Sequence, residues 1–149
     1  MPQPPDLDSL IAFYHELTPT SIARFPEFYR DDAEFRDPFN DVRGVAAIQR
    51  IFAHMFTQVD APRFVVSGRV ADADGVVLIW TFQFRAHWAP GDGTQAIHGV
   101  SHLVFDADGR IARHRDYWDA AEELYMKLPL LGRLMRWLQH HLEADSGAS

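Results

Sequence analysis

Cysteine and long apolar runs are both absent from this sequence. With no cysteine among its 149 residues, the chain has neither a disulfide bond nor a thiolate zinc site. No apolar run approaches the length of a membrane-spanning helix, and the start "MPQPPDLDSL" lacks the basic and apolar regions of a signal peptide. Because the sequence carries no targeting signal, we expect a cytoplasmic protein that does not enter a membrane.

Basic residues are also scarce. The chain has 14 Lys and Arg against 21 Asp and Glu, which gives a net charge of −7. Because phosphate contacts need a basic surface, this balance argues against a nucleic-acid partner. The sequence has no Gly-rich phosphate-binding loop, so it signals no cofactor. His98 and His102 would lie about 13 Å apart on a strand, too far to share an ion, and we predict no metal site.

Apolar and aromatic residues, in contrast, are plentiful. Apolar residues make up 47% of the chain and aromatic residues 13%, including 11 Phe. A chain of this length suits one domain, residues 1–149, with a real hydrophobic core. This composition favours a large apolar interior that can contain a pocket.

The spacing of apolar residues changes along the chain. A period of three to four residues predicts helices at both ends, and alternation with two "DADG" turns predicts antiparallel strands in the middle. This order indicates an α+β domain with helices packed on one side of the sheet. The expected helices cover 7–17, 20–29, 45–56, 119–127 and 130–142, the strands cover 31–37, 62–71, 75–88, 94–105 and 110–118, residues 126–142 form a C-terminal helical extension, and 143–149 form a disordered tail.

The stretch "DDAEFRDPFNDVRG", residues 31–44, contains an unusual pattern. If it is a strand, Ala33, Phe35 and Asp37 share one face, opposite three charged residues. An acid is thus aimed with apolar side chains, where burial would raise its pKa towards the range of a general base. The alternative is that Asp37 turns out of the sheet and caps the turn at Pro38.

Two segments resemble a known superfamily. "DDAEFRDPFNDVRGVAAIQRIF" resembles the segment of ketosteroid isomerases in which a strand aspartate precedes a proline and an amphipathic helix. "FDADGRIARHRDYWD" resembles the last hairpin of the same nuclear-transport-factor-2-like superfamily, which includes SnoaL-type polyketide cyclases and limonene-epoxide hydrolases. The resemblance covers about residues 7–125. It implies a cone-shaped α+β barrel, in which a curved antiparallel sheet wraps around the N-terminal helices and leaves an apolar cavity.

The resemblance also implies roles for individual residues. Asp37 matches the general base of the ketosteroid isomerases, and Tyr14 on the first helix matches their oxyanion donor. The alternative for Tyr14 is a core tyrosine with any hydrogen-bond partner. Where those enzymes place a second donor, a neutral aspartic acid, this chain has Ser101, which is a weaker donor.

A second candidate pair lies on the last strand. His114 and Asp116 share one face of it, and Asp116 matches an acid of the limonene-epoxide hydrolases. The Arg-x-Asp of those hydrolases is missing from "WTFQFRAHW". His114 and Asp116 could still act as acid and base, since histidine titrates near neutral pH. The alternative is a structural or solvent-facing pair.

These observations lead to one hypothesis and two alternatives. The protein binds a small hydrophobic carbonyl compound and catalyses proton transfer, as in isomerisation or polyketide-type cyclisation, with Asp37 as base and Tyr14 as donor. The alternatives are a non-catalytic binding or dimerisation module, and a hydrolase or dehydratase that uses His114 and Asp116. The family implies a homodimer through the outer sheet face. The expected lining of the cavity comprises Phe35, Phe39, Ile51, Met55, Trp80, Phe84, Ser101 and Trp118.

Overall fold

The structure is a computed structural model, and it describes residues 5–86, 89, 91–123 and 129–142. The chain divides into two compact units, Met1–Trp118 and Asp119–Ser149. The prediction of one domain over the whole chain stays a prediction.

Helices of the first unit form where the apolar period predicted them. α1 (Leu7–His15) begins at Asp6, whose carboxylate accepts a hydrogen bond from the backbone N–H of Ser9 at 3.0 Å. Its buried residues Leu10, Phe13 and Tyr14 recur at the three-to-four-residue spacing of one helix face. The other helical elements of this unit are η1 (Ser21–Arg24), α2 (Phe25–Phe28) and α3 (Val45–Gln58).

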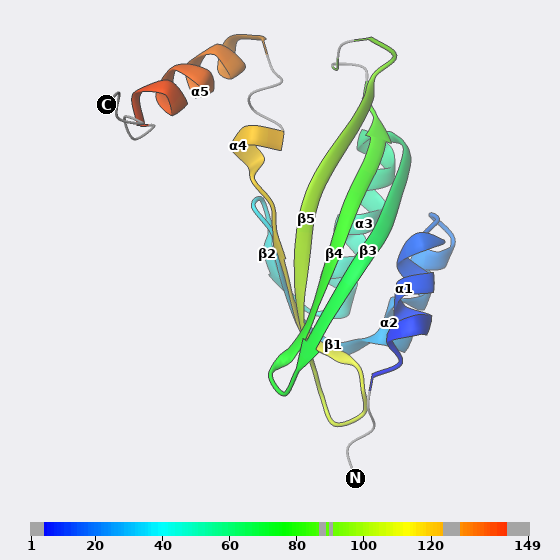
Figure 1. Ribbon diagram of the computed structural model, residues 1–149. Coiled ribbons are helices and arrows are strands. Elements are labelled where there is room, and N and C mark those ends of the chain that lie inside the picture. The colour runs from blue at the N-terminus through cyan, green and yellow to red at the C-terminus, as the bar shows by residue number, and fades with distance from the viewer. Residues whose placement is uncertain (1–4, 87–88, 90, 124–128, 143–149) are drawn as a thin grey trace. The chain divides into compact units, whose positions relative to one another are not determined.

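Six strands form one sheet, in the order β2-β1-β6-β5-β4-β3 (Figure 1). Neighbouring strands are antiparallel except β1 and β6, which run parallel. The predicted α+β fold with a curved sheet is confirmed. One pair of strands is parallel where an antiparallel sheet was expected, and the sheet is not closed into a barrel. The strands are β1 (Tyr29–Arg36), β2 (Asp41–Arg43), β3 (Asp60–Asp72), β4 (Gly75–Arg85), β5 (Thr94–Phe105) and β6 (Ile111–Tyr117).

The sheet curves around α3. This helix contacts β1 and also β3, although the order of the strands places three others between them. Both can touch one helix only if the sheet bends. The pairing of β3 with β4 has a register shift between Val66 and Gly68, and a bulge of this kind increases the local twist of a strand.

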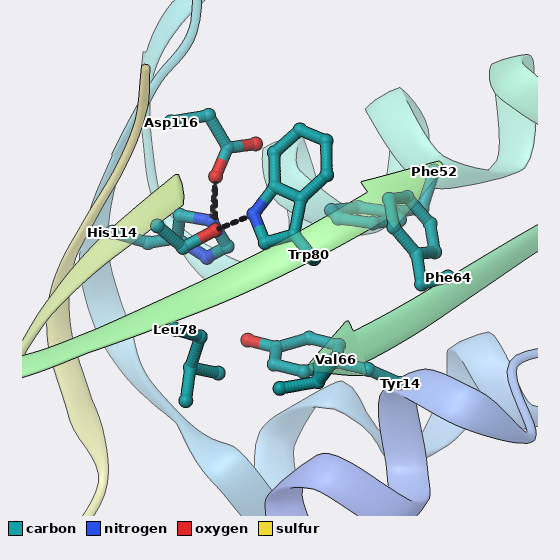
Figure 2. A pocket seen from close by; sticks show the side chains of 9 residues that line it. Tyr14, Phe52, Phe64, Val66, Leu78, Trp80, His114 and Asp116 are labelled. Carbon is teal, nitrogen blue, oxygen red and sulfur yellow. Dashed lines mark hydrogen bonds and ion pairs between the residues drawn. The ribbon is translucent and has the colours of Figure 1, made fainter. Parts of the chain in front are cut away.

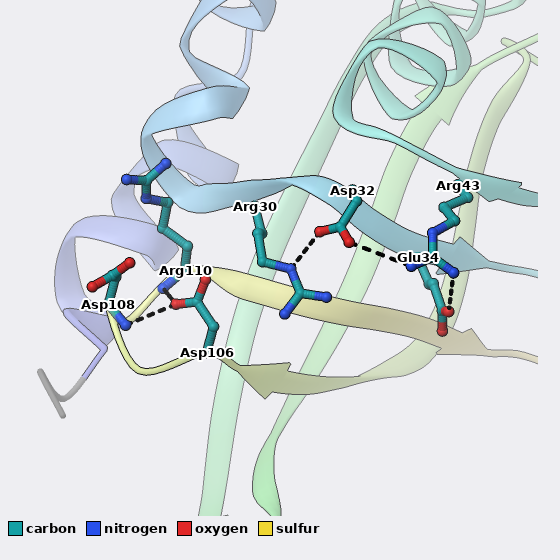
Figure 3. A network of polar contacts seen from close by, with 7 residues as sticks. All are labelled: Arg30, Asp32, Glu34, Arg43, Asp106, Asp108 and Arg110. Atoms are coloured by element: carbon teal, nitrogen blue, oxygen red, sulfur yellow. Dashed lines mark hydrogen bonds and ion pairs between the residues drawn. The ribbon is translucent and has the colours of Figure 1, made fainter.

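One face of the sheet carries the core and the other carries charge. On β1, Ala33 and Phe35 are buried, whereas Asp32 and Glu34 are exposed. The exposed side chains form an ion-pair network with Arg30 and Arg43 (Figure 3). The hydrogen bond from Arg30 holds the pKa of Asp32 below its usual value. The alternation read from the sequence for Ala33 and Phe35 is confirmed.

Trp80 of β4 lies across a gap that a glycine leaves on β5. Trp80 is opposite Gly99 in the register, and a Cβ at Gly99 would lie 2.5 Å from Cη2 of Trp80. Real Cβ contacts are never this short, so any larger residue at 99 must displace the indole ring. Glycine is therefore required here for packing between two strands.

The second unit contains α4 (Ala120–Glu123) and α5 (Pro129–Leu142). α4 lies within the predicted helix 119–127, and α5 begins one residue before the predicted helix 130–142. Residues 124–128 and the tail predicted to be disordered, 143–149, lie outside the described residues. Among the helices that the structure describes, none is long and apolar enough to cross a membrane.

We predict that Gly99→Ala destabilises the protein by about 1–3 kcal/mol, the usual cost of overpacking a core. Urea unfolding of wild type and variant measures the difference. Gly68→Ala is the control, because its Cβ would come no closer than 3.3 Å to the end of the Ile79 side chain. Equal stability of wild type and Gly99→Ala would contradict the packing account.

Candidate active site

A small cavity lies between α1, α3 and the inner face of the sheet (Figure 2). Its volume is about 20 Å³, which is room for about one water molecule. Its walls are mostly apolar, with four polar groups among them. The lining consists of Tyr14, Phe52, Phe64, Val66, Leu78, Trp80, Ser101, His114 and Asp116.

Two tyrosine hydroxyls and a histidine form the first part of a buried hydrogen-bond chain. The hydroxyls of Tyr14, from α1, and Tyr29, the first residue of β1, lie 2.5 Å apart. The hydroxyl of Tyr29 also lies 2.7 Å from Nδ1 of His114 on β6. All three side chains are buried, and His114 is only 3% exposed.

The chain continues from His114 to a carboxylate. Nε2 of His114 lies 2.6 Å from Oδ1 of Asp116. Oδ1 also accepts a hydrogen bond from the hydroxyl of Ser101 at 2.5 Å. The indole N–H of Trp80 donates to that hydroxyl at 2.8 Å. Six side chains are thus linked in one line.

The backbone explains why these groups meet. His114 and Asp116 are two residues apart on β6 and therefore point to the same face. Ser101 of β5 is directly opposite Asp116, and the gap at Gly99 lets the indole of Trp80 reach Ser101. In the described part of the chain, every buried side-chain nitrogen and oxygen has a hydrogen-bond partner.

Burial also sets the protonation of the two tyrosines. Loss of solvent raises the pKa of Tyr14, and the negative charge of Asp116 raises it further. Burial likewise raises the pKa of Tyr29 well above its ordinary value, and the neighbouring Tyr14 adds to this. Both side chains are therefore neutral phenols that can donate hydrogen bonds across the physiological pH range.

Asp37 is not among the residues that line this cavity. β1 ends at Arg36, and the carboxylate of Asp37 turns back to accept hydrogen bonds from the backbone N–H groups of Phe39, at 2.7 Å, and Asn40, at 2.6 Å. The side-chain amide of Asn40 donates to both carboxylate oxygens at 3.1 Å. The structure therefore shows Asp37 as a cap on the Pro38 turn, which was the alternative, and its expected role as a base stays a prediction.

The structure places the other predicted residues in different environments. Five of them come together in the cavity wall: Tyr14, Trp80, Ser101, His114 and Asp116. Phe35 is buried beside the cavity, where its ring lies 4.8 Å from that of His114. Phe39 is 55% exposed and contacts Trp118 instead. Of the residues expected to line the cavity, Phe35, Phe39, Ile51, Met55, Phe84 and Trp118 are outside its lining.

Sequence reasoning missed Tyr29 and four of the apolar lining residues. The sequence predicts Tyr29 at the end of the second helix, 20–29, but Tyr29 is the first residue of β1. A signal existed, because an extended Tyr29 falls on the same strand face as Ala33 and Phe35. The missed apolar residues are Phe52, Phe64, Val66 and Leu78.

Comparison with known proteins assigns the chain to a family. The SnoaL-like domain family matches residues 10–114, and the chain belongs to this family. It is 31% identical to a steroid Δ-isomerase of Nocardioides simplex over 105 residues, which are 66% of this chain and 76% of the isomerase. The resemblance read from the sequence is therefore confirmed.

Solved structures show the same fold at low sequence identity. One is a protein of Catenulispora acidiphila with a ketosteroid isomerase-like fold, in complex with trimethylamine (TM-score 0.68, 14% identity, 85% of this chain and 96% of that one). Another, from Jannaschia sp. CCS1, is proposed to be a SnoaL-like polyketide cyclase (TM-score 0.66, 14% identity, 78% and 86%). At these identities the likeness supports the fold alone.

We predict that the free energy of unfolding falls as the pH rises above about 10, the ordinary pKa of tyrosine. The folded protein keeps the phenol protons of Tyr14 and Tyr29, whose pKa values are raised, whereas the unfolded chain releases them. The stability that these two tyrosines contribute is fully present below the tyrosine pKa of the unfolded chain and is lost as the pH rises above it. Urea unfolding at several alkaline pH values measures the slope.

Tyr14→Phe provides the test of this assignment. It removes one of the two groups, so its stability should fall less steeply with pH than that of wild type. Each raised tyrosine contributes up to about 1.4 kcal/mol per pH unit to the slope. An unchanged slope in Tyr14→Phe would show that Tyr14 is not the responsible group.

Proposed function

We propose that the protein catalyses proton transfer on a small, apolar, carbonyl-bearing molecule. The reaction class is isomerisation of an unsaturated ketone or aldol-type cyclisation. One observation carries this proposal: a carboxylate, Asp116, and a neutral phenol, Tyr14, line the same largely apolar cavity. The family supports it, since the chain is 31% identical to a steroid Δ-isomerase.

Asp116 is the proposed base. Its carboxylate removes a proton from the carbon next to the carbonyl group, and the electron pair of that C–H bond moves to the carbonyl oxygen. In isomerisation, Asp116 returns the proton to a different carbon. In cyclisation, the enolate carbon attacks a second carbonyl of the same molecule, and the new alkoxide takes the proton. No co-reactant is needed in either case.

Asp116 suits this role better than its neighbour. Both ring nitrogens of His114 already have partners, Tyr29 at Nδ1 and Asp116 at Nε2. His114 has no free nitrogen for a ligand, so a hydrolase or dehydratase with His114 in direct contact is less well supported. Both hydrogen bonds that Asp116 accepts from Ser101 and His114 end on Oδ1, and the proposed proton acceptor is Oδ2.

Tyr14 is the proposed oxyanion donor. A neutral phenol in a dry cavity stabilises a developing enolate more than water would, because the local dielectric constant is low. Ser101 does not supply a second donor, since its single hydroxyl hydrogen is directed at Asp116. The cavity has room for about one water molecule, so a larger substrate requires the lining side chains to move apart.

We predict that Asp116→Asn lowers turnover of a β,γ-unsaturated ketone by about 10²–10⁴-fold, because an amide cannot accept the proton. Tyr14→Phe should lower it by about 10²–10³-fold through loss of the donor. The measurement is the absorbance of the conjugated enone formed from a β,γ-unsaturated ketosteroid and from 3-cyclohexenone.

Asp37→Asn is the matched control, the same chemical change at the other candidate acid. An amide oxygen can still cap the turn at Pro38, so its turnover should stay within about twofold of wild type. Loss of activity in Asp37→Asn with activity retained in Asp116→Asn would contradict the proposal. No turnover of either ketone by wild type would favour the non-catalytic binding module.

A further inference from the structure

We infer that Tyr29 is a positioning residue for this reaction. Its hydroxyl connects Tyr14 to His114, so that Tyr14 donates a hydrogen bond into the cavity only when Nδ1 of His114 carries a proton. Tyr29 lies between the two, 2.5 Å from the hydroxyl of Tyr14 and 2.7 Å from Nδ1. It does not line the cavity. The inference rests on the proposed function, in which Tyr14 is the oxyanion donor.

The hydrogen bonds at the Trp80 end of this series have a fixed donor-to-acceptor direction. An indole N–H can only donate, so the hydroxyl of Ser101 accepts from Trp80 and directs its own hydrogen at Asp116. When ionised, the carboxylate of Asp116 accepts at Oδ1 from both neighbours. Nε2 of His114 must therefore carry a hydrogen to bond to it at 2.6 Å.

When His114 is neutral, this arrangement leaves Nδ1 without a hydrogen. Nδ1 then accepts the hydroxyl hydrogen of Tyr29. The 2.5 Å contact between the two tyrosine oxygens still needs one hydrogen, and only Tyr14 can provide it. In this state Tyr14 presents lone pairs to the cavity and cannot stabilise an oxyanion.

When Nδ1 gains a proton, the direction reverses. Nδ1–H donates to the oxygen of Tyr29, Tyr29 donates to Tyr14, and the hydroxyl hydrogen of Tyr14 becomes available to a ligand. Asp116 remains a carboxylate and His114 an imidazolium, so the base and the oxyanion donor are present together. The titratable groups that face His114 in the described chain are Tyr14 of α1, Tyr29 of β1 and Asp116 of β6.

The proton on His114 can be observed directly without substrate. Two-dimensional ¹⁵N NMR of the ring nitrogens of ligand-free wild type, recorded across pH, should show hydrogen on Nε2 alone at alkaline pH. Acidification should add a proton at Nδ1 while the protein remains folded. A hydrogen on Nδ1 at alkaline pH, or no protonation of Nδ1 before acid unfolding, would overturn the inference.

Tyr29→Phe tests the consequence for catalysis. The hydroxyl of Tyr29 is the hydrogen-bond partner of Tyr14 among the residues that the structure describes, so in Tyr29→Phe the donation by Tyr14 should no longer depend on His114. Wild-type kcat should be about 10²-fold lower at a pH where NMR shows Nδ1 without hydrogen than at a pH where Nδ1 is protonated, the usual cost of one lost donor. In Tyr29→Phe the same pH change should alter kcat by less than about threefold.

The outcomes separate this inference from the proposed function. A Tyr29→Phe variant with the wild-type pH profile would overturn the inference while leaving proton transfer intact. Absence of ketone turnover would refute the proposed function, and the NMR result would still decide the direction of the hydrogen-bond chain. If Tyr29→Phe does not fold, the wild-type NMR titration alone tests the switch.

Discussion

The contact between His114 and Asp116 is the interaction on which the site depends. His114 is buried and the Asp116 side chain is only 16% exposed, in a largely apolar region where an unpaired polar group would cost several kcal/mol. Hydrogen bonds continue from both sides of their 2.6 Å contact. One series runs from His114 through Tyr29 to Tyr14, and the other runs from Asp116 through Ser101 to Trp80. Each side chain is a hydrogen-bond partner of the next. In the described chain, no buried side-chain nitrogen or oxygen is therefore left without a partner.

The architecture positions these groups through strand register. Adjacent strands β5 and β6 bring Ser101 opposite Asp116, and the parallel pairing of β1 with β6 brings Phe35 beside His114. The resemblance to ketosteroid isomerases implied two independent oxyanion donors. Here the hydroxyl of Ser101 donates to the carboxylate of Asp116 instead, so the proposed donor, Tyr14, and the proposed base, Asp116, are connected by a single line of hydrogen bonds.

Sequence patterns predicted the elements well and the site in part. The alternating pattern correctly predicted that Ala33 and Phe35 are buried, but it did not predict the position of Asp37. The carboxylate of Asp37 accepts hydrogen bonds from two backbone N–H groups just beyond Pro38 and turns away from the core. The inward face of β3 could not be read, since Phe64, Val65 and Val66 are consecutive apolar residues. The parallel pairing and the role of Tyr29 depend on long-range contacts that no local pattern contains.

The most direct test of the central claim is exchange of the α-hydrogens of cyclohexanone in D₂O, followed by ¹H NMR. This measures proton removal next to a carbonyl without requiring the natural substrate. The account predicts that wild type and Asp37→Asn catalyse the exchange and that Asp116→Asn does not. Exchange that persists in Asp116→Asn and disappears in Asp37→Asn would contradict the account.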